Sequence, residues 1–363
     1  MTARSYTVLL TCVGGVYARD TIEALRLDVE QQLRIVGTDA AGDVANRYAV
    51  DAFYQVPSAA ADPNGFLDVV TGTCRRERVD LVLPCADDEV TVLAGARDRL
   101  EAAGIRCAVQ DVRTLETVRD KLRLFDYLCA AGIPVPRYAA VRSANNLVSV
   151  ASSLGYPRTP FVLKPSVSRG ARGVTIVDPG VSALRALPGS RGHRTGPVGA
   201  VAKALTEEGV TVPLMAMELL SGAAYDVDCL ADRGRAYCTV VRRRLWRDPL
   251  SPVSQGCRIE AHPEIEALVA QIALALGLDG AVDMDFGSAP NGTAGLFEVN
   301  PRWSGSVASS LAGGVNVPAL LVRQLRGLPL LNTSVTPGSS MFPVTRMTFV
   351  TEADPIGSLV DEA

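Results

Sequence analysis

The first 111 residues alternate short apolar runs with helical stretches, and this alternation constrains the fold more than any other feature of the sequence. The apolar runs expected to form strands are Tyr6–Leu10, Arg34–Thr38, Ala52–Val56, Leu81–Pro84 and Ile105–Val109. Helical stretches separate several of them, at 20–33, 65–78 and 87–103. Strands joined by helices lie parallel, because the helix carries the chain back across one face of the sheet. We therefore predict a doubly wound parallel-sheet domain over residues 1–113.

The remainder of the chain has α+β character. A helix is expected over Thr114–Ala131, with Gly132 as its stop signal. The later strands are expected at Phe161–Lys164, Val174–Val177, Leu214–Leu220, Ala224–Ala231, Ala236–Arg244, Gly280–Gly287 and Gly295–Val299, with a helix at Pro263–Leu276 and a helical segment beginning at Val307–Ala312. The strand at Ala236–Arg244 is expected to pair antiparallel with the strand at Ala224–Ala231. We predict a second domain over residues 114–330 and a C-terminal extension over 331–363.

Composition narrows the class of protein. Hydrophobic residues make up 48% and charged residues 21% of the 363 residues, and the net charge is -3, so the chain can bury sizeable cores and carries no basic excess for nucleic acid. The eight cysteines form no CxxC pair, and only two histidines occur, which disfavours zinc sites and His-based triads. Met1–Tyr6 lacks an apolar signal-peptide core, and no apolar run reaches membrane-spanning length. We expect a cytoplasmic protein that acts on small molecules.

Lysine is rare in this chain. Lysine and arginine together number 36, but the only lysines are Lys121, Lys164 and Lys203. Arginine therefore supplies positive charge wherever any cation suffices. A lysine that is kept against this bias is a candidate for a role that needs a compact ammonium group on a flexible stem.

The segments around Asp285 and Glu298 predict a metal site. The turn at 290–293 makes the two strands a hairpin, so that Asp285 and Glu298 face each other, and alternation puts Asn300 on the same face as Glu298. Oxygen ligands of this kind suit Mg²⁺, which is completed by water and phosphate oxygens. The alternative is an acidic hairpin that faces solvent. The apolar neighbours of Glu298 favour a buried strand, in which a carboxylate needs a cation.

A second candidate site follows Lys164, which ends an apolar strand. The loop from 165 to 173 is rich in small residues, including Ser168, Gly170 and Gly173. Backbone N–H groups of such a loop can approach phosphate oxygens, while the lysine places a point charge on them. It is not a Walker A loop, since no GK[ST] and no following helix occur. The alternative is an ordinary surface loop.

Three further segments are candidates for ligand contacts. Glu218, Leu219 and Leu220 end a strand before a glycine turn, where an adenine edge and face can be held, although the same pattern is also an ordinary turn. Alternation sends Arg242 and Arg244 to one face, where guanidinium groups can hold a carboxylate or an acylphosphate. The alternative there is a solvated basic patch. Trp303, Ser304, Gly305 and Ser306 follow the metal ligands and are expected to border the substrate pocket, with a core position as the alternative for Trp303.

Together these segments resemble the ATP-grasp superfamily, particularly its members related to the carbamoyl-phosphate synthase large subunit and to D-alanine–D-alanine ligase. The resemblance covers nearly the whole chain, and its most specific part is the string at 297–306, Phe-Glu-Val-Asn-Pro-Arg-Trp-Ser-Gly-Ser. It implies an ATP-grasp fold with a preceding α/β domain over 1–113, an ATP-grasp domain over 114–330 with a lid at about 138–217, and an antiparallel C-terminal lobe.

The resemblance also implies roles for individual residues. Lys121 matches a lysine that enters the nucleotide site from outside the lid, Lys164 the lid lysine, and Glu218–Leu220 the adenine hinge. Asp285, Glu298 and Asn300 match ligands of two magnesium ions, for which Mn²⁺ can substitute. Arg302 matches an arginine that contacts the transferred phosphate or the substrate. One position departs from the pattern: Ala224 stands where the family commonly has a ribose-binding glutamate, and Asp226, on the same strand face, is the candidate replacement.

The resemblance implies a reaction in which a carboxylate and ATP give an acylphosphate and ADP, and an amine then gives an amide and phosphate. The carboxylate is expected to be an amino acid or a related small acid, and a homodimer is the expected assembly. Three other functions are open. They are carboxylation or carbamoylation through bicarbonate, a non-catalytic nucleotide sensor, and an NAD(P)-dependent oxidoreductase. The last is suggested by Thr11–Gly15 and Asp39, although the third glycine of GxGxxG is lacking.

Overall fold

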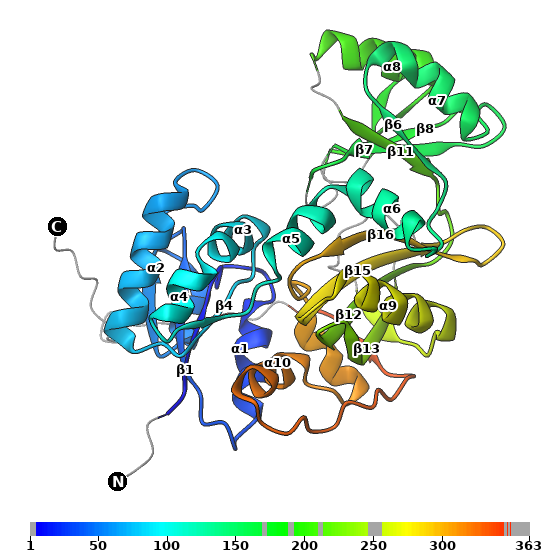
Figure 1. Cartoon of the computed structure of the whole chain (residues 1–363). Coiled ribbons are helices and arrows are strands. Elements are labelled where there is room, and N and C mark those ends of the chain that lie inside the picture. Colours follow the sequence, from blue (N-terminus) through cyan, green and yellow to red (C-terminus); the bar gives the residue numbers. More distant parts are fainter. Residues whose placement is uncertain are drawn as a thin grey trace.

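The computed structural model describes residues 5–168, 173–187, 192–209, 213–245, 256–344, 347 and 349. Figure 1 shows three parts along this chain: an N-terminal α/β domain, a small α+β lid, and a larger C-terminal lobe built on an antiparallel sheet. Within the described residues, none of the helices combines the length and apolarity needed to cross a membrane.

The N-terminal domain is a parallel sheet between helices. Its strands are β1 (Thr7–Leu10), β2 (Arg34–Asp39), β3 (Ala52–Gln55), β4 (Leu81–Leu83) and β5 (Arg106–Cys107), in the order β3-β2-β1-β4-β5. Its helices are α1 (Ala18–Leu27), α2 (Pro63–Glu77), α3 (Asp87–Gly95) and α4 (Arg97–Ala102), with the 3₁₀ helix η1 (Ala45–Ala49). The order reverses at β1, so the carboxyl ends of β1 and β4 flank the switch point at which α/β sheets commonly bind ligands.

Two predicted helices of this domain have different bounds. The helix expected to reach residue 33 ends at Leu27, because Asp28 leaves the helix and its carboxylate accepts hydrogen bonds from Arg323. The helix expected over 87–103 is divided at Ala96 into α3 and α4.

A single helix was also predicted over Thr114–Ala131, and here too the structure has two: α5 (Val112–Arg119) and α6 (Lys121–Ala130). Asp120 separates them. Its extended backbone ends α5, and its carboxylate caps α6 by accepting from the N–H groups of Leu122 (3.0 Å) and Arg123 (3.4 Å). As a result Lys121 is the first residue of α6, and its own N–H donates to the carbonyl of Ser166 at 2.9 Å.

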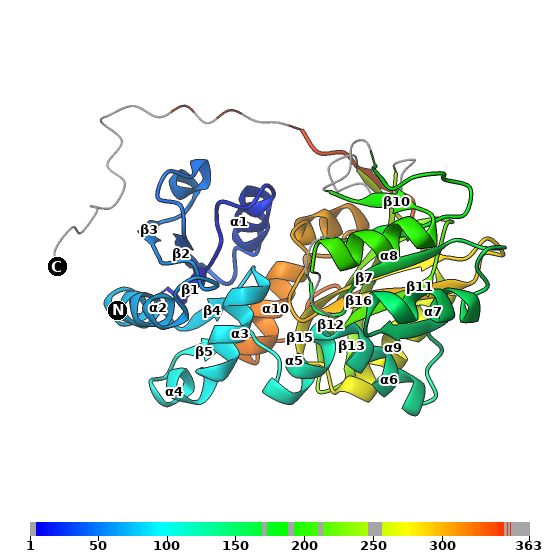
Figure 2. The same cartoon turned by 90° about the horizontal axis from the view of Figure 1, so that it is seen from above.

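The lid consists of a six-stranded sheet covered on one face by two helices (Figures 1 and 2). In spatial order the strands are β6 (Tyr138–Val141), β11 (Leu214–Glu218), β7 (Phe161–Pro165), β8 (Thr175–Val177), β10 (Arg194–Gly196) and β9 (Arg185–Ala186). The 3₁₀ helix η2 (Ala144–Asn146) precedes α7 (Leu147–Ser153), and α8 (Val198–Glu207) follows β10. Lys164 lies at the end of β7, opposite Met215 of β11.

The C-terminal lobe contains a second six-stranded sheet. In spatial order its strands are β16 (Ala294–Asn300), β15 (Gly280–Ser288), β12 (Ala224–Asp232), β13 (Arg235–Arg244), β14 (Cys257–Ile259) and β17 (Ser340–Met341). The helices are α9 (Pro263–Leu276), η3 (Val307–Gly313) and α10 (Val317–Arg326). The predicted antiparallel pairing is confirmed for β12 with β13 and for the β15–β16 hairpin, in which Asp285 lies opposite Glu298 and Asp283 opposite Asn300.

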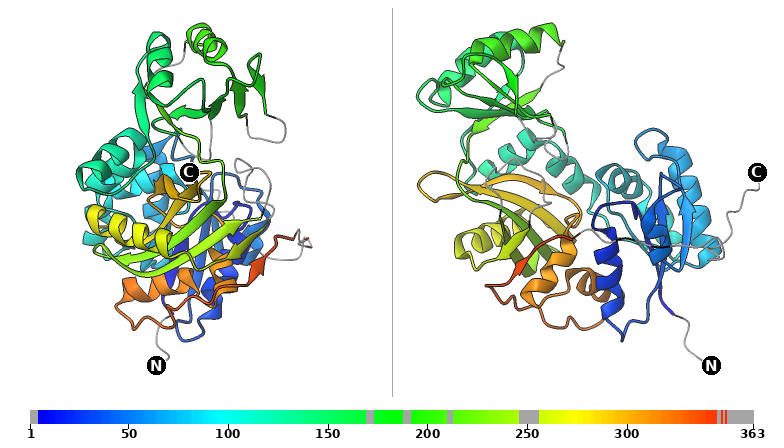
Figure 3. Two further views of the ribbon diagram at one scale, coloured as in Figure 1. Left: turned by 90° about the vertical axis from the view of Figure 1, so that its right-hand side faces the viewer. Right: turned by 180° about the vertical axis from the view of Figure 1, so that it is seen from behind.

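The N-terminal domain and the C-terminal lobe share one apolar core. Side chains from β1 and α1, such as Leu10 and Ile22, belong to the same buried cluster as Trp303, Val307 and Leu320. At the edge of this core, Arg323 of α10 forms a buried ion pair with Asp28 at 2.5 Å. Figure 3 shows α10 lying beside α1 between the two parts. The N-terminal domain is therefore held in place against the lobe.

The segment that connects the lid to the lobe packs against two glycines of the β15–β16 hairpin. Leu220, between β11 and β12, is buried over the β15–β16 hairpin. A Cβ atom at Gly287 or Gly295 would come within 2.9 Å of the Leu220 side chain, which is closer than real contacts allow. The hairpin therefore needs glycine at both positions to let the connection pack this closely.

Candidate functional site

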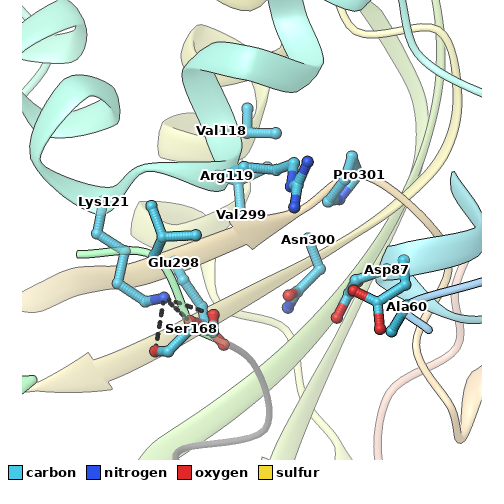
Figure 4. Close-up of a pocket in the computed structure, with 12 residues that line it drawn as sticks. Ala60, Asp87, Val118, Arg119, Lys121, Ser168, Glu298, Val299, Asn300 and Pro301 are labelled. Carbon is cyan, nitrogen blue, oxygen red and sulfur yellow. Dashed lines mark hydrogen bonds and ion pairs between the residues drawn. The ribbon is translucent and has the colours of Figure 1, made fainter. Parts of the chain in front are cut away.

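A pocket of about 250 Å³ lies where the N-terminal domain, α5, α6 and the end of β16 meet (Figure 4). Its wall is formed by Ala60, Asp87, Asp88, Val118, Arg119, Lys121, Val167, Ser168, Glu298, Val299, Asn300 and Pro301. Four of the residues predicted to bind ATP or metal thus come together from distant parts of the chain. They are Lys121, Ser168, Glu298 and Asn300.

Lys121 is the charged centre of one end of this pocket. Its side chain is buried, and Nζ forms an ion pair with Glu298 Oε2 at 3.0 Å. Nζ also donates to the carbonyl of Ser168 at 3.0 Å, as the dashed lines in Figure 4 show. The start of helix α6 is thereby tied to strand β16 and to the beginning of the loop that follows β7.

Lys164 approaches Glu298 from the lid. Its Nζ donates to the carbonyl of Phe297 at 3.0 Å and lies over the Phe297 ring. Burial, together with the nearby charge of Lys121, lowers the pKa of Lys164 to about 7. For Glu298, burial opposes ionisation, but Lys121 and Lys164 outweigh it and hold the pKa of this carboxyl below its ordinary value.

The hairpin brings two partly buried carboxyl groups into contact. Asp285 lies opposite Glu298, and their side chains hydrogen-bond. Burial raises the pKa of Asp285 well above its ordinary value, although the charge of Arg244 acts in the opposite direction. Two carboxyl groups this close need a proton or a cation between them. The pair therefore fits a cation site.

Asn300 supplies a third oxygen beside the two carboxyl groups. Its Nδ2 donates to Asp283 Oδ2 at 3.1 Å and, more weakly, to Asp285 Oδ2 at 3.5 Å. These bonds use the amino side of the amide, which leaves the carbonyl oxygen as an acceptor. No group of three or more His, Cys, Asp or Glu side chains in the described ranges is arranged for a metal ion, so any such site depends on this amide oxygen and on ligand or water oxygens.

Arg244 and Asp226 lie one strand further from the pocket. Arg244 pairs with both Asp226 and Asp285, with 2.7 Å from Nη2 to Asp285 Oδ1 and 2.9 Å from Nε to Asp226 Oδ1. Asp226 is itself buried, and despite the cost of burial the two arginines Arg244 and Arg242 lower its pKa. Arg244 thus engages one carboxylate oxygen of Asp226 inside the sheet, and the replacement of the ribose-binding glutamate by Asp226 stays a prediction.

Arg242 is enclosed by the protein on all sides. It is 0% exposed and forms an ion pair with Asp228 at 2.9 Å. It also donates to Ser306 Oγ at 2.7 Å and Ser309 Oγ at 3.1 Å. The predicted role in holding substrate is therefore wrong for Arg242. Alternation placed it on the same face as Arg244, but it cannot tell that η3 covers this part of the face.

Arg302 connects the lobe to the N-terminal domain. Its Nε lies 3.0 Å from Asp87 Oδ1 at the start of α3, and its Nη1 lies 3.5 Å from Asp283 Oδ2. Nη1 also donates to the carbonyl of Trp303 at 2.9 Å. Arg302 thus borders the pocket through Asp87, a residue that the sequence did not single out.

The residues after Arg302 are mostly buried. Trp303 belongs to the shared core, with its Nε1 3.3 Å from Cys85 Sγ, so the alternative core position is the correct one. Ser304 and Ser306 are buried and hydrogen-bond to each other at 3.1 Å. Only Gly305 of this group is exposed. The predicted contact of Trp303, Ser304 and Ser306 with substrate is contradicted by this burial.

The loop after Lys164 is described only in part. Ser168 lines the pocket. Gly173 has a left-handed backbone, and a Cβ there would lie 3.0 Å from Pro165 Cγ, so glycine is required for the close return of the loop. Gly170 lies outside the described residues.

The hinge residues lie at the junction of lid and lobe, away from the pocket lining. Glu218 ends β11, and its carboxylate accepts from the N–H and the guanidinium of Arg137, both at 3.4 Å. Leu219 is partly buried, and Leu220 packs on the hairpin glycines. Their predicted adenine contact is neither made nor prevented by these neighbours.

Three charged residues of the pocket were missed from the sequence: Asp87, Asp88 and Arg119. The two acids follow β4 at the switch point of the N-terminal sheet, a signal that could have drawn attention to them. Arg119 directly precedes Asp120 and Lys121, but nothing in the sequence shows that α5 ends there.

Asp39, the acidic residue that suggested a dinucleotide site, is engaged by the backbone of its own domain. Asp39 Oδ2 accepts from the N–H of Gly14 at 2.7 Å, and Asp39 Oδ1 accepts from the N–H of Ala41 at 2.9 Å. The carboxylate therefore closes the loop after β1 instead of facing a ribose.

Two families of known proteins match this sequence. Residues 8–108 match the family described as "PylC-like, N-terminal domain", and residues 211–349 match "ATP-grasp in the biosynthetic pathway with Ter operon". Among curated proteins, the carbamoyl phosphate synthase large chain of Rubrobacter xylanophilus is 25% identical over 346 residues, which are 90% of this chain and 30% of that protein. The chain spans less than a third of the length of such relatives.

Solved structures share the fold. Biotin carboxylase from Campylobacter jejuni is 16% identical with a TM-score of 0.69, covering 92% of this chain and 74% of that one. L-amino acid ligase from Bacillus licheniformis is 18% identical with a TM-score of 0.61, covering 89% and 74%. At these identities the likeness concerns the fold alone. Residues 211–349 thus match an ATP-grasp family, and the chain as a whole has the ATP-grasp fold.

Proposed function

We propose that this protein is an ADP-forming ligase that activates a small carboxylate with ATP and transfers the acyl group to an amine. The observation that carries the proposal is the ion pair of Lys121 with Glu298 at 3.0 Å, set beside Lys164 and the Asp285–Asn300 oxygen donors. Two cations and three oxygen donors are assembled around Glu298, and Lys121, Glu298 and Asn300 among them line the pocket. This is the set that phosphoryl transfer requires.

Asp285, Glu298 and Asn300 would hold magnesium. The contact between the two carboxyl groups and the free carbonyl oxygen of Asn300 fit a hard cation. When bound, magnesium neutralises charge on the phosphate oxygens of ATP.

Lys121 and Lys164 carry the remaining positive charge toward the phosphates. In the reaction, a carboxylate oxygen of the substrate bonds to the γ-phosphorus, and the bond from that phosphorus to the ADP oxygen breaks. The amine then bonds to the carbonyl carbon, the bond to the phosphate oxygen breaks, and the nitrogen loses a proton. The lysines stabilise the negative charge that moves between these oxygens.

The proposed reaction requires no covalent nucleophile from the protein. None of the described lining residues is a cysteine or a histidine. The acylphosphate must then be kept from water. Val167 and Ser168, at the start of the loop after β7, line the pocket beside Lys121 and would cover that end.

A second candidate function is activation of bicarbonate. It is favoured by the likeness of the fold to biotin carboxylase and by the match to carbamoyl phosphate synthase large chains. It uses the same phosphoryl transfer and differs in the acid that attacks ATP.

Phosphate release tests the two candidates. The protein is incubated with ATP, Mg²⁺ and all pairs of the twenty standard amino acids, and separately with bicarbonate and each amino acid. We expect ADP and phosphate to form with amino acids in bicarbonate-free buffer. Formation only when bicarbonate is added would favour the second candidate.

Glu298→Gln tests the site itself. We expect this variant to lose ADP formation at least a hundredfold while its far-UV spectrum is unchanged. The matched control is Glu207→Gln, because Glu207 also faces a lysine, Lys203 at 3.7 Å, but is exposed on α8. Full activity of the Glu298 variant would refute the assignment.

A further inference from the structure

Arg119 is a charged residue of the pocket that no motif accounts for. It is the last residue of α5, directly after the buried Val118, and its side chain is partly buried. Figure 4 shows its guanidinium group extending over the pocket toward the side where Asn300 and Pro301 lie.

The guanidinium of Arg119 has no acidic partner within ion-pair distance among the residues that the structure describes. This sets it apart from other charges of the pocket. Lys121 is neutralised by Glu298 at 3.0 Å, and Asp87 by Arg302 at 3.0 Å. Among the described lining residues, Arg119 is therefore a cation without an acidic partner, and an anionic group of a ligand can pair with it.

The position of Arg119 distinguishes its ligand from the phosphates of ATP. The lysines expected to hold phosphate lie at the lid end, where Lys121 contacts Ser168. Arg119 lies further toward the N-terminal domain, on the side of the pocket that Asp87 and Ala60 close (Figure 4). A group bound there would stand next to the phosphoryl end without replacing the phosphates.

Size and geometry limit the ligand. The pocket holds about 250 Å³, below the usual range for drug-sized ligands, so it suits a small molecule. A guanidinium group matches the two oxygens of a carboxylate through parallel hydrogen bonds.

We propose that Arg119 binds the carboxylate of the acid substrate and turns it toward the γ-phosphoryl group of ATP. The acid is a small one, of the size of an amino acid or a short organic acid. This inference rests on the proposed ligase function. It assigns to Arg119 the selection of the acid, separately from the binding of the nucleotide.

Binding measured without turnover tests this assignment. The intact protein is mixed with Mg²⁺ and the non-hydrolysable analogue AMP-PNP, and then titrated with the twenty standard amino acids, acetate, lactate and succinate. The shift of the unfolding temperature gives the apparent affinity. We expect at least one acid to stabilise the wild-type protein, and its carboxamide analogue to fail.

Arg119→Gln should weaken the affinity for that acid roughly ten- to a hundredfold, the range of a hydrogen-bonded charge contact. Arg119→Lys should recover part of it. The affinity for Mg²⁺ and AMP-PNP should be the same in all variants. Arg113→Gln, an exposed arginine on the same helix outside the pocket lining, is the matched control.

Each result bears on one proposal. If Arg119→Gln keeps the acid affinity, if carboxamides bind as well as acids, or if no acid stabilises a protein that binds AMP-PNP, the role of Arg119 is refuted while the nucleotide site stands. If the wild-type protein does not bind Mg²⁺ and AMP-PNP, the proposed function itself fails.

Discussion

At the scale of single residues, the site depends on a few buried charges that set one another's protonation. Glu298 stays ionised because Lys121 and Lys164 outweigh its burial, whereas Lys164 loses part of its own charge to burial. In the proposed function, the same lysines pair with the phosphates when ATP binds. Binding of ATP at this site should therefore change the proton balance of the protein.

This proton balance gives the first prediction. With its pKa lowered to about 7, Lys164 is largely neutral in the free protein above pH 7. Phosphate favours its charged form, so MgATP binding should take up a fraction of a proton between pH 7.5 and 8.5, and affinity should fall as pH rises through this range. Calorimetric titration in buffers of different ionisation enthalpy measures the uptake. In Lys164→Met the uptake should vanish, and equal uptake in both proteins would contradict the assignment.

A second prediction concerns the buried pair of Arg242 and Asp228. Removing one partner of such a pair leaves an uncompensated charge, which costs about 3–5 kcal/mol. Asp228→Asn should therefore lower the free energy of unfolding by about 3 kcal/mol in urea titrations. The double variant Asp228→Leu with Arg242→Met should recover most of this loss. If the single variant is as stable as the wild type, the ion pair of Arg242 with Asp228 does not stabilise the folded protein.

At the scale of secondary-structure elements, the break between α5 and α6 determines where two cations of the pocket lie. Asp120 ends one helix and caps the next, which places Arg119 at the C-terminus of α5 and Lys121 at the N-terminus of α6. A continuous helix would rotate neighbouring residues by about 100° each, following from 3.6 residues per turn. The break instead lets both side chains line one pocket.

Asp120→Ala tests this element. Loss of the cap should lower the free energy of unfolding by about 1 kcal/mol and weaken MgATP affinity, because the capping bonds to Leu122 and Arg123 fix the first turn that carries Lys121. Asp120→Asn retains an acceptor and should restore most of both. Urea titration and calorimetry give the two quantities. A loss of stability with unchanged ATP affinity would separate the cap from the site.

Much of the element order could be predicted, because short strands and amphipathic helices leave local periodic patterns. The register of Asp285 with Glu298 followed from the turn at 290–293, and the structure has it. The features that could not be predicted are those that depend on tertiary contacts. The alternation of side chains along the strand showed which face of the sheet Arg242 lies on, but not that η3 covers this face. The helical pattern alone could not show that Asp120 would leave the helix. Asp87 and Arg119 became visible only when distant segments met.

At the scale of the whole molecule, the N-terminal domain is part of the site and part of the core. It contributes Ala60, Asp87 and Asp88 to the pocket, and its β1 and α1 side chains pack with Trp303 and Leu320 of the lobe. The ion pair of Asp28 with Arg323 closes the edge of this contact. The domain and the lobe should therefore unfold together.

The fourth prediction follows from this shared core. A fragment of residues 1–113 should lack a cooperative thermal transition and should bind the dye ANS, because the faces of β1 and α1 that contact the lobe become exposed. Circular dichroism and dye fluorescence check both properties. Coexpression with residues 114–363 should restore a cooperative complex. A fragment that melts cooperatively alone would show that the contact with the lobe is dispensable for folding.

The rarity of lysine has a practical consequence. Of the three lysines, Lys121 and Lys164 are buried beside Glu298, and Lys203 is exposed on α8. Reductive methylation with ¹³C-formaldehyde would place isotopic reporters on only these three side chains and the terminal amine. An NMR spectrum of the labelled protein would then contain a few resolved signals, with Lys203 as an internal reference. Such a spectrum would show nucleotide, metal and acid arriving at the site one after another, without a mutation or an attached dye.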